Sequence, residues 1–172
     1  MPRYIEAKTI LSSVKNKPDT YFGLSYNMNL YRGCQHSCIY CDSRSDCYQL
    51  GDLSDIRIKK SAIQILEREL RSKRLRGTVG FGSMNDCYMP VEREYQLTRK
   101  SLLLMIKYKF PVHIITKSDL VLRDIDLLKE ISKIYAAISV TITTTDDNLS
   151  RIIEPNAPIS SKRFETLRQL SA

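Results

Sequence analysis

Apolar residues recur along the chain in two alternating patterns. They stand at helical spacing over 59–75, and the segment at 78–82 that follows is a short, nearly continuous apolar run. Helical spacing returns at 91–109, and apolar runs return at 112–116 and at 136–145, the last rich in β-branched residues. Amphipathic helices that alternate with buried strands are typical of βαβ units and a parallel sheet. The pattern therefore predicts an α/β fold.

The remaining segments are less regular. Asp124 is placed to cap a helix that follows it, and a last amphipathic helix is expected at roughly 160–170. Residues 1–33 are expected to be mostly irregular or extended. The stretch 34–48 is rich in Ser, Asp and Cys, and this polarity indicates a loop.

The length of the chain limits the architecture. Its 172 residues suffice for one domain with a buried core. A complete (βα)8 barrel needs about 250 residues, so the chain matches only part of one. We expect either a barrel that lacks its later strands on the C-terminal side or a small open sheet.

Charge and hydropathy indicate which partners and which location fit the protein. Lys and Arg number 27 and Asp and Glu 19, which gives a formal net charge of +8. This charge permits an anionic partner such as nucleic acid but does not by itself select one. No apolar run reaches the ~18 residues of a membrane span, and the N-terminus has no apolar signal core. We expect a cytoplasmic protein without a membrane partner.

Cysteine is the most informative residue type. The chain has five, an odd number that speaks against a disulfide framework. Three of them, Cys34, Cys38 and Cys41, are spaced C-x3-C-x2-C, so a short loop could bring three soft thiolate ligands to one centre. The spacing predicts a metal ion or an iron–sulfur cluster.

Two centres fit this spacing. Three thiolates on a cubane cluster leave one iron without a protein ligand, which suits catalysis. Alternatively, His36 or Cys47 could complete a tetrahedral zinc site. A zinc-stabilised nucleic-acid-binding module without catalysis is therefore the alternative that the residues leave open.

The residues around the cysteines resemble the signature of the radical S-adenosylmethionine (radical SAM) enzymes, in which an aromatic residue, here Tyr40, precedes the third cysteine. The wider string resembles the spore photoproduct lyase-like branch, whose members include DNA repair photolyases. The resemblance spans roughly residues 25–170. The matching positions are Arg32-Gly33-Cys34-x-His36-x-Cys38-x-Tyr40-Cys41-x-x-Arg44, Asp86-x-Tyr88-x-Pro90-x-Glu92, Thr116-Lys117-Ser118, Arg123-Asp124, Glu154-Pro155 and Arg163.

The resemblance implies a fold and a chemistry. It implies a partial (βα)6 barrel over 25–172, with 1–24 as an N-terminal extension and a first strand near 22–30. The three spaced cysteines would hold a 4Fe–4S cluster, and SAM would chelate the fourth iron. An electron from the cluster would cleave SAM to methionine and a 5′-deoxyadenosyl radical, which takes hydrogen from the substrate. A nucleic-acid lesion as substrate and a flavodoxin or ferredoxin-type electron donor are the implied partners.

The resemblance also implies contacts to SAM, each of which has a structural alternative. Tyr40 would lie near the adenine, and Asn85 and Asp86 would receive the ammonium group. Lys117 would pair with the carboxylate, and Ser139 would face the ribose or the carboxylate. The alternatives are a packed loop aromatic, an Asx-capped turn, a surface lysine and a buried serine bonded to backbone.

Two further cysteines need separate treatment. In the lyase a hydrogen-donating cysteine stands shortly before the Asp that Asp86 matches, and Ser83 occupies that position here. Cys87 comes after Asp86 and is a candidate hydrogen donor, with a small buried residue as the alternative. Cys47 is interpreted as a bystander. Glu154 and Arg163 could form a structural ion pair.

Overall fold

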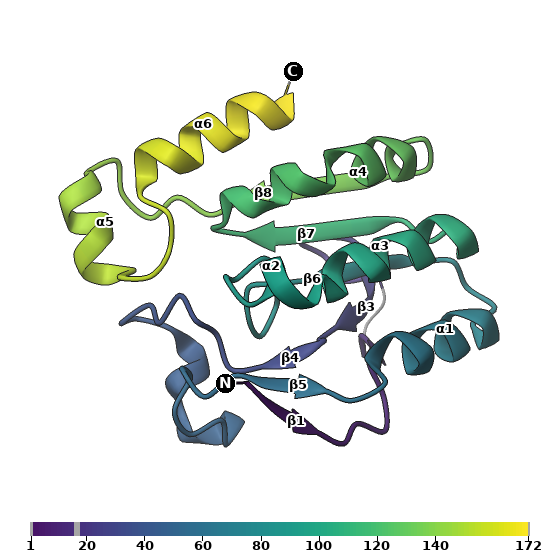
Figure 1. The fold of residues 1–172 in the computed structure, drawn as a ribbon. Coiled ribbons are helices and arrows are strands. Elements are labelled where there is room, and N and C mark those ends of the chain that lie inside the picture. Colours follow the sequence, from purple (N-terminus) through teal and green to yellow (C-terminus); the bar gives the residue numbers. More distant parts are fainter. Residues whose placement is uncertain (1, 16–17, 172) are drawn as a thin grey trace.

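The computed structural model describes residues 2–15 and 18–171, and a five-stranded sheet lies at its centre (Figure 1). Strands β3, β6, β7 and β8 run parallel in that order, and β2 pairs antiparallel with β3. The predicted parallel α/β architecture is thus confirmed, and so is the strand expected near 22–30. The strands span Leu11–Ser13 (β2), Leu24–Met28 (β3), Thr78–Phe81 (β6), Val112–Thr116 (β7) and Ala136–Val140 (β8).

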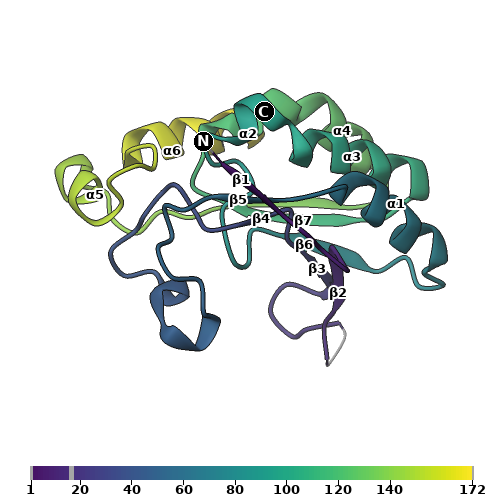
Figure 2. The same ribbon diagram turned by 60° about the horizontal axis from the view of Figure 1, so that its bottom comes forward.

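The long helices lie on one side of this sheet (Figure 2). Leu66 and Leu102 from two of them are fully buried, as are Val79 and Ile114 from the sheet, and together they belong to one core. Each such side chain contributes about 1.5–3 kcal/mol on burial. No helix in the described residues is long and apolar enough to cross a membrane. The helices are α1 (Ala62–Ser72), α3 (Leu97–Tyr108), α4 (Ile125–Ser132) and α6 (Ser160–Ser171).

A second, three-stranded sheet was not predicted. Its order is β1–β5–β4, with β5 parallel to β1 and antiparallel to β4. The strands have only two or three residues each, too few to show an alternating pattern. The expected extension, residues 1–24, thus contributes β1 to this sheet and β2 to the larger one. The strands span Arg3–Ile5 (β1), Tyr31–Arg32 (β4) and Arg57–Lys59 (β5).

The loop predicted at 34–48 is confirmed. It contains two short 3-10 turns, Asp42–Arg44 and Asp46–Tyr48, and otherwise no helix or strand. In both figures it projects from the end of β4, well away from the helices that cover the large sheet.

The helix predicted at 91–109 is two helices. α2 (Glu92–Tyr95) and α3 are separated by Gln96, whose φ of 53° is left-handed and interrupts the helical backbone. The Glu92 carboxylate accepts the first free amides of α3, from Thr98 at 3.0 Å and from Arg99 at 3.4 Å. Glu92 therefore acts as an N-terminal cap from outside the helix, which periodicity does not reveal.

Asp124 does not cap α4, contrary to the prediction. Its side chain makes no capping hydrogen bond and is fully buried. Instead the carboxylate accepts hydrogen bonds from Arg99 Nη1 at 2.8 Å and from Arg123 Nη2 at 2.7 Å. Arg123 also binds Glu92 Oε1 at 3.0 Å, so a buried ionic network joins α2, α3 and the start of α4.

The strand predicted at 136–145 ends at Val140. The chain then leaves the sheet and enters α5 (Asp147–Ile153), a seven-residue helix that was not predicted. Asp146 caps it, because its carboxylate accepts the amides of Asn148 and Leu149. The β-branched residues beyond Val140 therefore lie in the connection and not in the sheet.

The buried network yields the first testable prediction. Replacing Glu92 by Ala removes an acceptor for Tyr31, Arg123 and the α3 amides and leaves their hydrogen bonds unmade. We expect Glu92→Ala to lower the free energy of unfolding by about 3 kcal/mol in urea titrations. The exposed neighbour Glu94 is the control, and its change to Ala should alter stability by no more than about 0.5 kcal/mol. Equally small losses of stability in Glu92→Ala and Glu94→Ala would contradict the role of the network.

Candidate functional site

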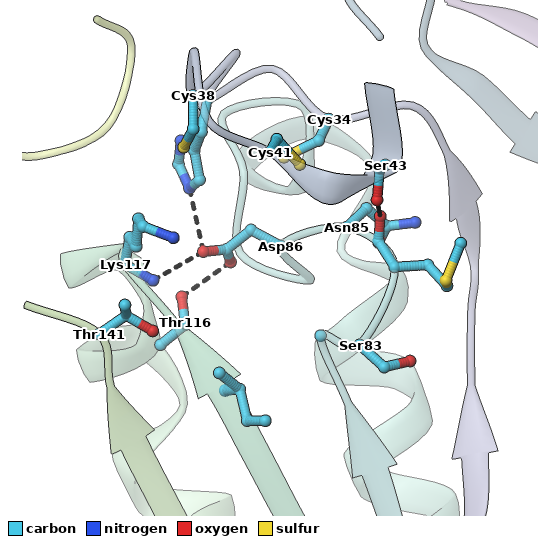
Figure 3. A pocket seen from close by; sticks show the side chains of 14 residues that line it. Cys34, Cys38, Cys41, Ser43, Ser83, Asn85, Asp86, Thr116, Lys117 and Thr141 are labelled. Carbon is cyan, nitrogen blue, oxygen red and sulfur yellow. Dashed lines mark hydrogen bonds and ion pairs between the residues drawn. The ribbon is translucent and has the colours of Figure 1, made fainter. Parts of the chain in front are cut away.

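A cavity of about 180 Å³ lies where β6, β7 and β8 end (Figure 3). Three segments and one residue beyond β8 line it: the cysteine loop, 82–86 after β6, 115–117 at the end of β7, and Thr141. The carboxyl ends of parallel strands are where binding sites of α/β proteins form. Chain segments far apart in sequence thus meet at one edge of the sheet.

Cys34, Cys38 and Cys41 all line this cavity, as the spacing predicts. Burial raises the pKa of Cys34 to about 11, so without a cation the thiol stays protonated. No three His, Cys, Asp or Glu side chains in the described residues converge closely enough to hold one metal ion. Thiolates of a 4Fe–4S cluster bind separate iron atoms and need not converge on one point. Three thiols on one cavity wall therefore fit such a cluster.

Asp86 joins three segments of the site (Figure 3). Its Oδ1 accepts from the Thr116 hydroxyl at 2.7 Å and from the Tyr88 amide at 2.9 Å. Its Oδ2 accepts from the Lys117 amide at 2.7 Å and lies 3.0 Å from His36 Nε2. A carboxylate has about four acceptor positions, so these contacts occupy all of them. This geometry favours a role for Asp86 in positioning its neighbours. The predicted contact between Asp86 and the SAM ammonium stays untested.

His36 connects the cysteine loop to Asp86. The ring is 2% exposed, its Nδ1 lies 3.2 Å from the Asn156 carbonyl, and its Nε2 faces Asp86. Both ring nitrogens thus face oxygen atoms of the protein. Burial raises the pKa of Asp86, but His36, the Lys117 amide and the Thr116 hydroxyl outweigh it, so the pKa is lowered. His36 is therefore engaged within the protein and does not serve as the zinc ligand considered above.

Tyr40 and Lys117 lie together at the edge of the cavity. The Lys117 ammonium lies 5.7 Å from the centre of the Tyr40 ring and 3.8 Å from Glu154 Oε1. Lys117 lines the cavity, and its charge works against the rise that burial causes in the pKa of Cys38. Tyr40 is half exposed and donates its hydroxyl hydrogen to Glu154. The structure thus brings Lys117 to the cavity and places Tyr40 beside it.

The segment 153–156 holds the cysteine loop from the other side. The Ile39 amide donates to the Ile153 carbonyl at 2.9 Å, and the Asn156 amide donates to the His36 carbonyl at 3.4 Å. Glu154 adds the contact to Tyr40. We call 153–156 the strap, because it contacts the loop at three of its residues.

The strap is anchored by the ion pair that the sequence suggested. Glu154 and Arg163 are both fully buried, and Glu154 Oε2 lies 2.5 Å from Arg163 Nη2. Arg163 also donates to the Pro158 carbonyl at 2.6 Å and to the Thr141 carbonyl at 3.1 Å. The ion pair is therefore confirmed, and the link from Glu154 to the cysteine loop is a feature that sequence reasoning missed.

Asn85 and Ser139 have different environments. The Asn85 side chain lines the cavity and donates to the Tyr31 carbonyl at 2.9 Å, which leaves its Oδ1 as an acceptor. Ser139 lies within β8, and its hydroxyl is 2.7 Å from His113 Nε2. Thr141, two residues further on, lines the cavity instead. The predicted contact between Ser139 and SAM therefore has no support from the geometry.

Cys87 does not line the cavity, which favours the alternative of a small buried residue, and its predicted role as a hydrogen donor stays untested. It is 5% exposed, belongs to the hydrophobic core and does not line the site. Burial raises the pKa of its thiol well above the usual value. Ser83 lines the cavity in its place. Cys47 is exposed and its sulfur lies 3.2 Å from the Ser45 hydroxyl, in agreement with a bystander role.

Gly82 allows the end of β6 to approach β7. Its φ is +93°, and a Cβ there would lie 2.1 Å from the Ile115 carbonyl oxygen. No side chain fits at that distance, and the left-handed backbone itself favours glycine. Residues 83–86 therefore leave the sheet directly beside the end of β7.

The strap gives a prediction with a defined pH dependence. Burial raises the pKa of Glu154, but Arg163, Tyr40 and Lys117 outweigh it, so the folded-state pKa lies below the unfolded value of 4.5. The ionised group stabilises the fold above that value, and this contribution is lost as the pH falls. We expect Glu154→Gln to lower the free energy of unfolding by about 3 kcal/mol at neutral pH. The difference from the unmodified protein should narrow below about pH 4 in urea titrations.

The control for this experiment is Glu165→Gln. Glu165 forms an exposed ion pair with Arg168 on α6, and its loss should cost less than about 1 kcal/mol at any pH. If the free energy of unfolding of Glu154→Gln differed from that of the unmodified protein by the same amount at every pH, the proposed ionisation of Glu154 would be contradicted.

Comparison with known proteins places this geometry in a family. The model of the radical SAM superfamily matches residues 28–172. An uncharacterised protein of Methanocaldococcus jannaschii is 35% identical over 168 residues, which covers 96% of this chain and 62% of that protein. One of Mycobacterium tuberculosis is 28% identical over 174 residues, which covers 96% of this chain and 50% of that protein. The chain thus spans between half and about three-fifths of these relatives' length.

Solved structures show the same fold. Spore photoproduct lyase complexed with dinucleoside spore photoproduct matches with a TM-score of 0.68 at 14% identity, over 98% of this chain and 47% of that chain. A variant of the lyase with bound AdoMet and the same dinucleoside gives a TM-score of 0.64 at 12% identity, over the same shares. The partial barrel of the radical SAM kind is therefore confirmed as the fold class. With the family match over most of its length, this chain belongs to the radical SAM superfamily.

Proposed function

We propose that this chain forms the cluster-binding and SAM-binding part of a radical SAM enzyme that acts on nucleic acid. One observation carries the proposal: three cysteines of a single loop line one cavity at the carboxyl ends of parallel strands. Lys117 and Asn85, which offer a cation and a free acceptor, line the same cavity. The family match over 28–172 supports this interpretation.

The residues fit the two groups that the family implies. Cys34, Cys38 and Cys41 would hold a 4Fe–4S cluster through three of its irons. When bound, the cluster supplies the electron that cleaves SAM to methionine and a 5′-deoxyadenosyl radical. Lys117 would pair with the carboxylate of SAM, and Asn85 Oδ1 would accept from its ammonium group. Tyr40, held by Glu154, would cover the adenine.

A nucleic-acid substrate is supported by the net charge of +8 and by the fold that the chain shares with spore photoproduct lyase. The chain departs from the lyase-like pattern at Ser83, because a serine hydroxyl does not replace a thiol as a hydrogen donor. Cys87 is buried in the core and does not line the cavity, so it is not proposed for that role. We therefore propose that the enzyme abstracts hydrogen from a nucleic acid. The hydrogen that is later returned to the substrate would not come from a thiol at position 83.

An electron must reach the cluster from outside. Ile39 and Tyr40, between two of the cluster-binding cysteines, are 59% and 49% exposed, so a partner can approach the loop there. A flavodoxin or a ferredoxin-type protein would serve as the donor. Such donors and free thiols both belong to a reducing compartment, which fits a cytoplasmic setting.

The cluster assignment predicts a clear difference between cysteines. Cys38→Ala should lose the iron and sulfide that the unmodified protein takes up on anaerobic reconstitution, because one of three ligands is missing. Cys47→Ala should retain most of both, because Cys47 is exposed and does not line the cavity. Iron and sulfide analysis with the visible absorption of the cluster makes the comparison. Equal losses would indicate a site of four thiolates.

The same preparation tests the enzyme against the zinc alternative. With a strong reductant, the reconstituted protein should convert SAM to 5′-deoxyadenosine, measured by chromatography. Stoichiometric zinc without any such conversion would overturn the proposed function.

A further prediction concerns SAM binding. Lys117→Gln removes the cation proposed for the SAM carboxylate, and we expect the dissociation constant to rise about tenfold in equilibrium dialysis with the oxidised, reconstituted protein. Lys162→Gln is the matched control, since Lys162 is 52% exposed and pairs with Asp119 outside the cavity. An equal weakening in both variants would show that the effect comes from overall charge.

A further inference from the structure

A second cavity, of about 270 Å³, lies beside the first. Met84 and Asn85 line both, so the segment after β6 forms a wall between them. The second cavity has a different chemistry from the first, because no cysteine lines it and two cations do. Its polar lining includes the side chains of Asn29, Arg32, Tyr48 and Lys59.

Arg32 and Lys59 come from neighbouring antiparallel strands, β4 and β5. Both side chains are half-buried, and burial and the charge of Arg32 lower the pKa of Lys59. Neither cation forms an ion pair with an acid in the part of the chain that the structure describes. The charge of Glu69 acts in the opposite direction and raises the pKa of Lys59, but its carboxylate is engaged, because it accepts the amides of Ile10 and Leu11.

The polar groups around these cations are held in place. Arg32 Nη2 donates to the Gln49 carbonyl at 2.7 Å and to the Tyr48 carbonyl at 3.5 Å, which leaves the hydrogens of Nε and Nη1 for a ligand. The Tyr48 hydroxyl donates to Asp42 at 2.6 Å, so that carboxylate is engaged as well. Asn29 Oδ1 is buried and has no hydrogen-bond partner.

Such an arrangement costs free energy unless a ligand completes it. Two like charges taken partly out of water repel each other and lose hydration, and a buried acceptor without a donor adds to the cost. An anion between the two cations removes the repulsion. The planar fork of arginine matches the oxygens of a phosphate, and a lysine adds a point charge.

We propose that this second cavity binds a phosphate group of the nucleic-acid substrate through Arg32 and Lys59. The inference rests on the proposed function for the identity of the ligand, whereas the binding requires neither SAM cleavage nor electron transfer. Asn29 Oδ1 would accept a hydrogen bond from a hydroxyl or N–H group of the same ligand, and Tyr48 offers an aromatic surface beside it. The shared wall of Met84 and Asn85 places this contact next to the reaction cavity.

The test is binding of a fluorescein-labelled single-stranded hexathymidylate to the reconstituted protein, followed by anisotropy at several salt concentrations. We expect Lys59→Gln and Arg32→Gln each to weaken binding about tenfold and to reduce the salt slope by about one. Lys60→Gln is the matched control, because it removes the same charge one residue away, where an exposed lysine pairs with Glu6. That variant should change affinity less than about twofold.

Charge-conserving variants separate a binding defect from a folding defect. Lys59→Arg should retain most of the affinity, whereas Arg32→Lys keeps the charge but loses the planar fork and should retain only part of it. Both should have thermal midpoints like that of the unmodified protein. Unlabelled thymidine 5′-monophosphate, inorganic phosphate and hexathymidylate then serve as competitors. If unlabelled hexathymidylate competes at a lower concentration than the other two compounds, the bound phosphate belongs to a nucleic acid. If all three compete equally well, a nucleic acid is not the source of the phosphate.

Two other results would overturn the inference: no loss of binding in Lys59→Gln and Arg32→Gln, or an equal loss in Lys60→Gln. Failure of the proposed function is seen separately, as a lack of SAM cleavage by the unmodified protein in the absence of any oligonucleotide. The two failures are therefore distinguishable.

Discussion

The candidate site depends on one buried carboxylate, that of Asp86. A 3.0 Å contact with His36 Nε2 and three hydrogen bonds connect it to the cysteine loop, to the end of β7 and to its own turn. A buried charge is tolerated only when its partners compensate for lost hydration. The contacts of Asp86 are therefore a structural requirement, and they set how far the cysteine loop stands from the strand ends.

The strap provides a second constraint from the opposite direction. Asp86 holds His36 from the sheet, and Glu154 and Asn156 hold the same loop from the segment after α5. The loop is thus fixed on two sides between its cysteines, although it contains no regular helix or strand of its own. A loop fixed in this way is preorganised, and a group that binds to it meets ligands whose positions are already limited.

The sequence predicted those features that leave a local or periodic trace. Alternating helices and strands revealed the parallel sheet, and the spacing of Cys34, Cys38 and Cys41 revealed three side chains of one cavity. Contacts between distant residues leave no such trace. The hydrogen bond from Tyr40 to Glu154 joins positions 114 residues apart, and Arg32 and Lys59 line one cavity because two very short strands pair. Residue type could suggest these groups but not their partners.

Gly82 has a consequence for how this site can vary. Because a Cβ there would collide with the backbone of β7, the separation of the two strand ends is set by main-chain atoms and cannot be widened by a larger side chain. On this side of the cavity, changes in size or polarity can instead arise at the positions that follow, where Ser83 and Met84 line it. These few adjacent residues offer a compact target for redesign of the cavity.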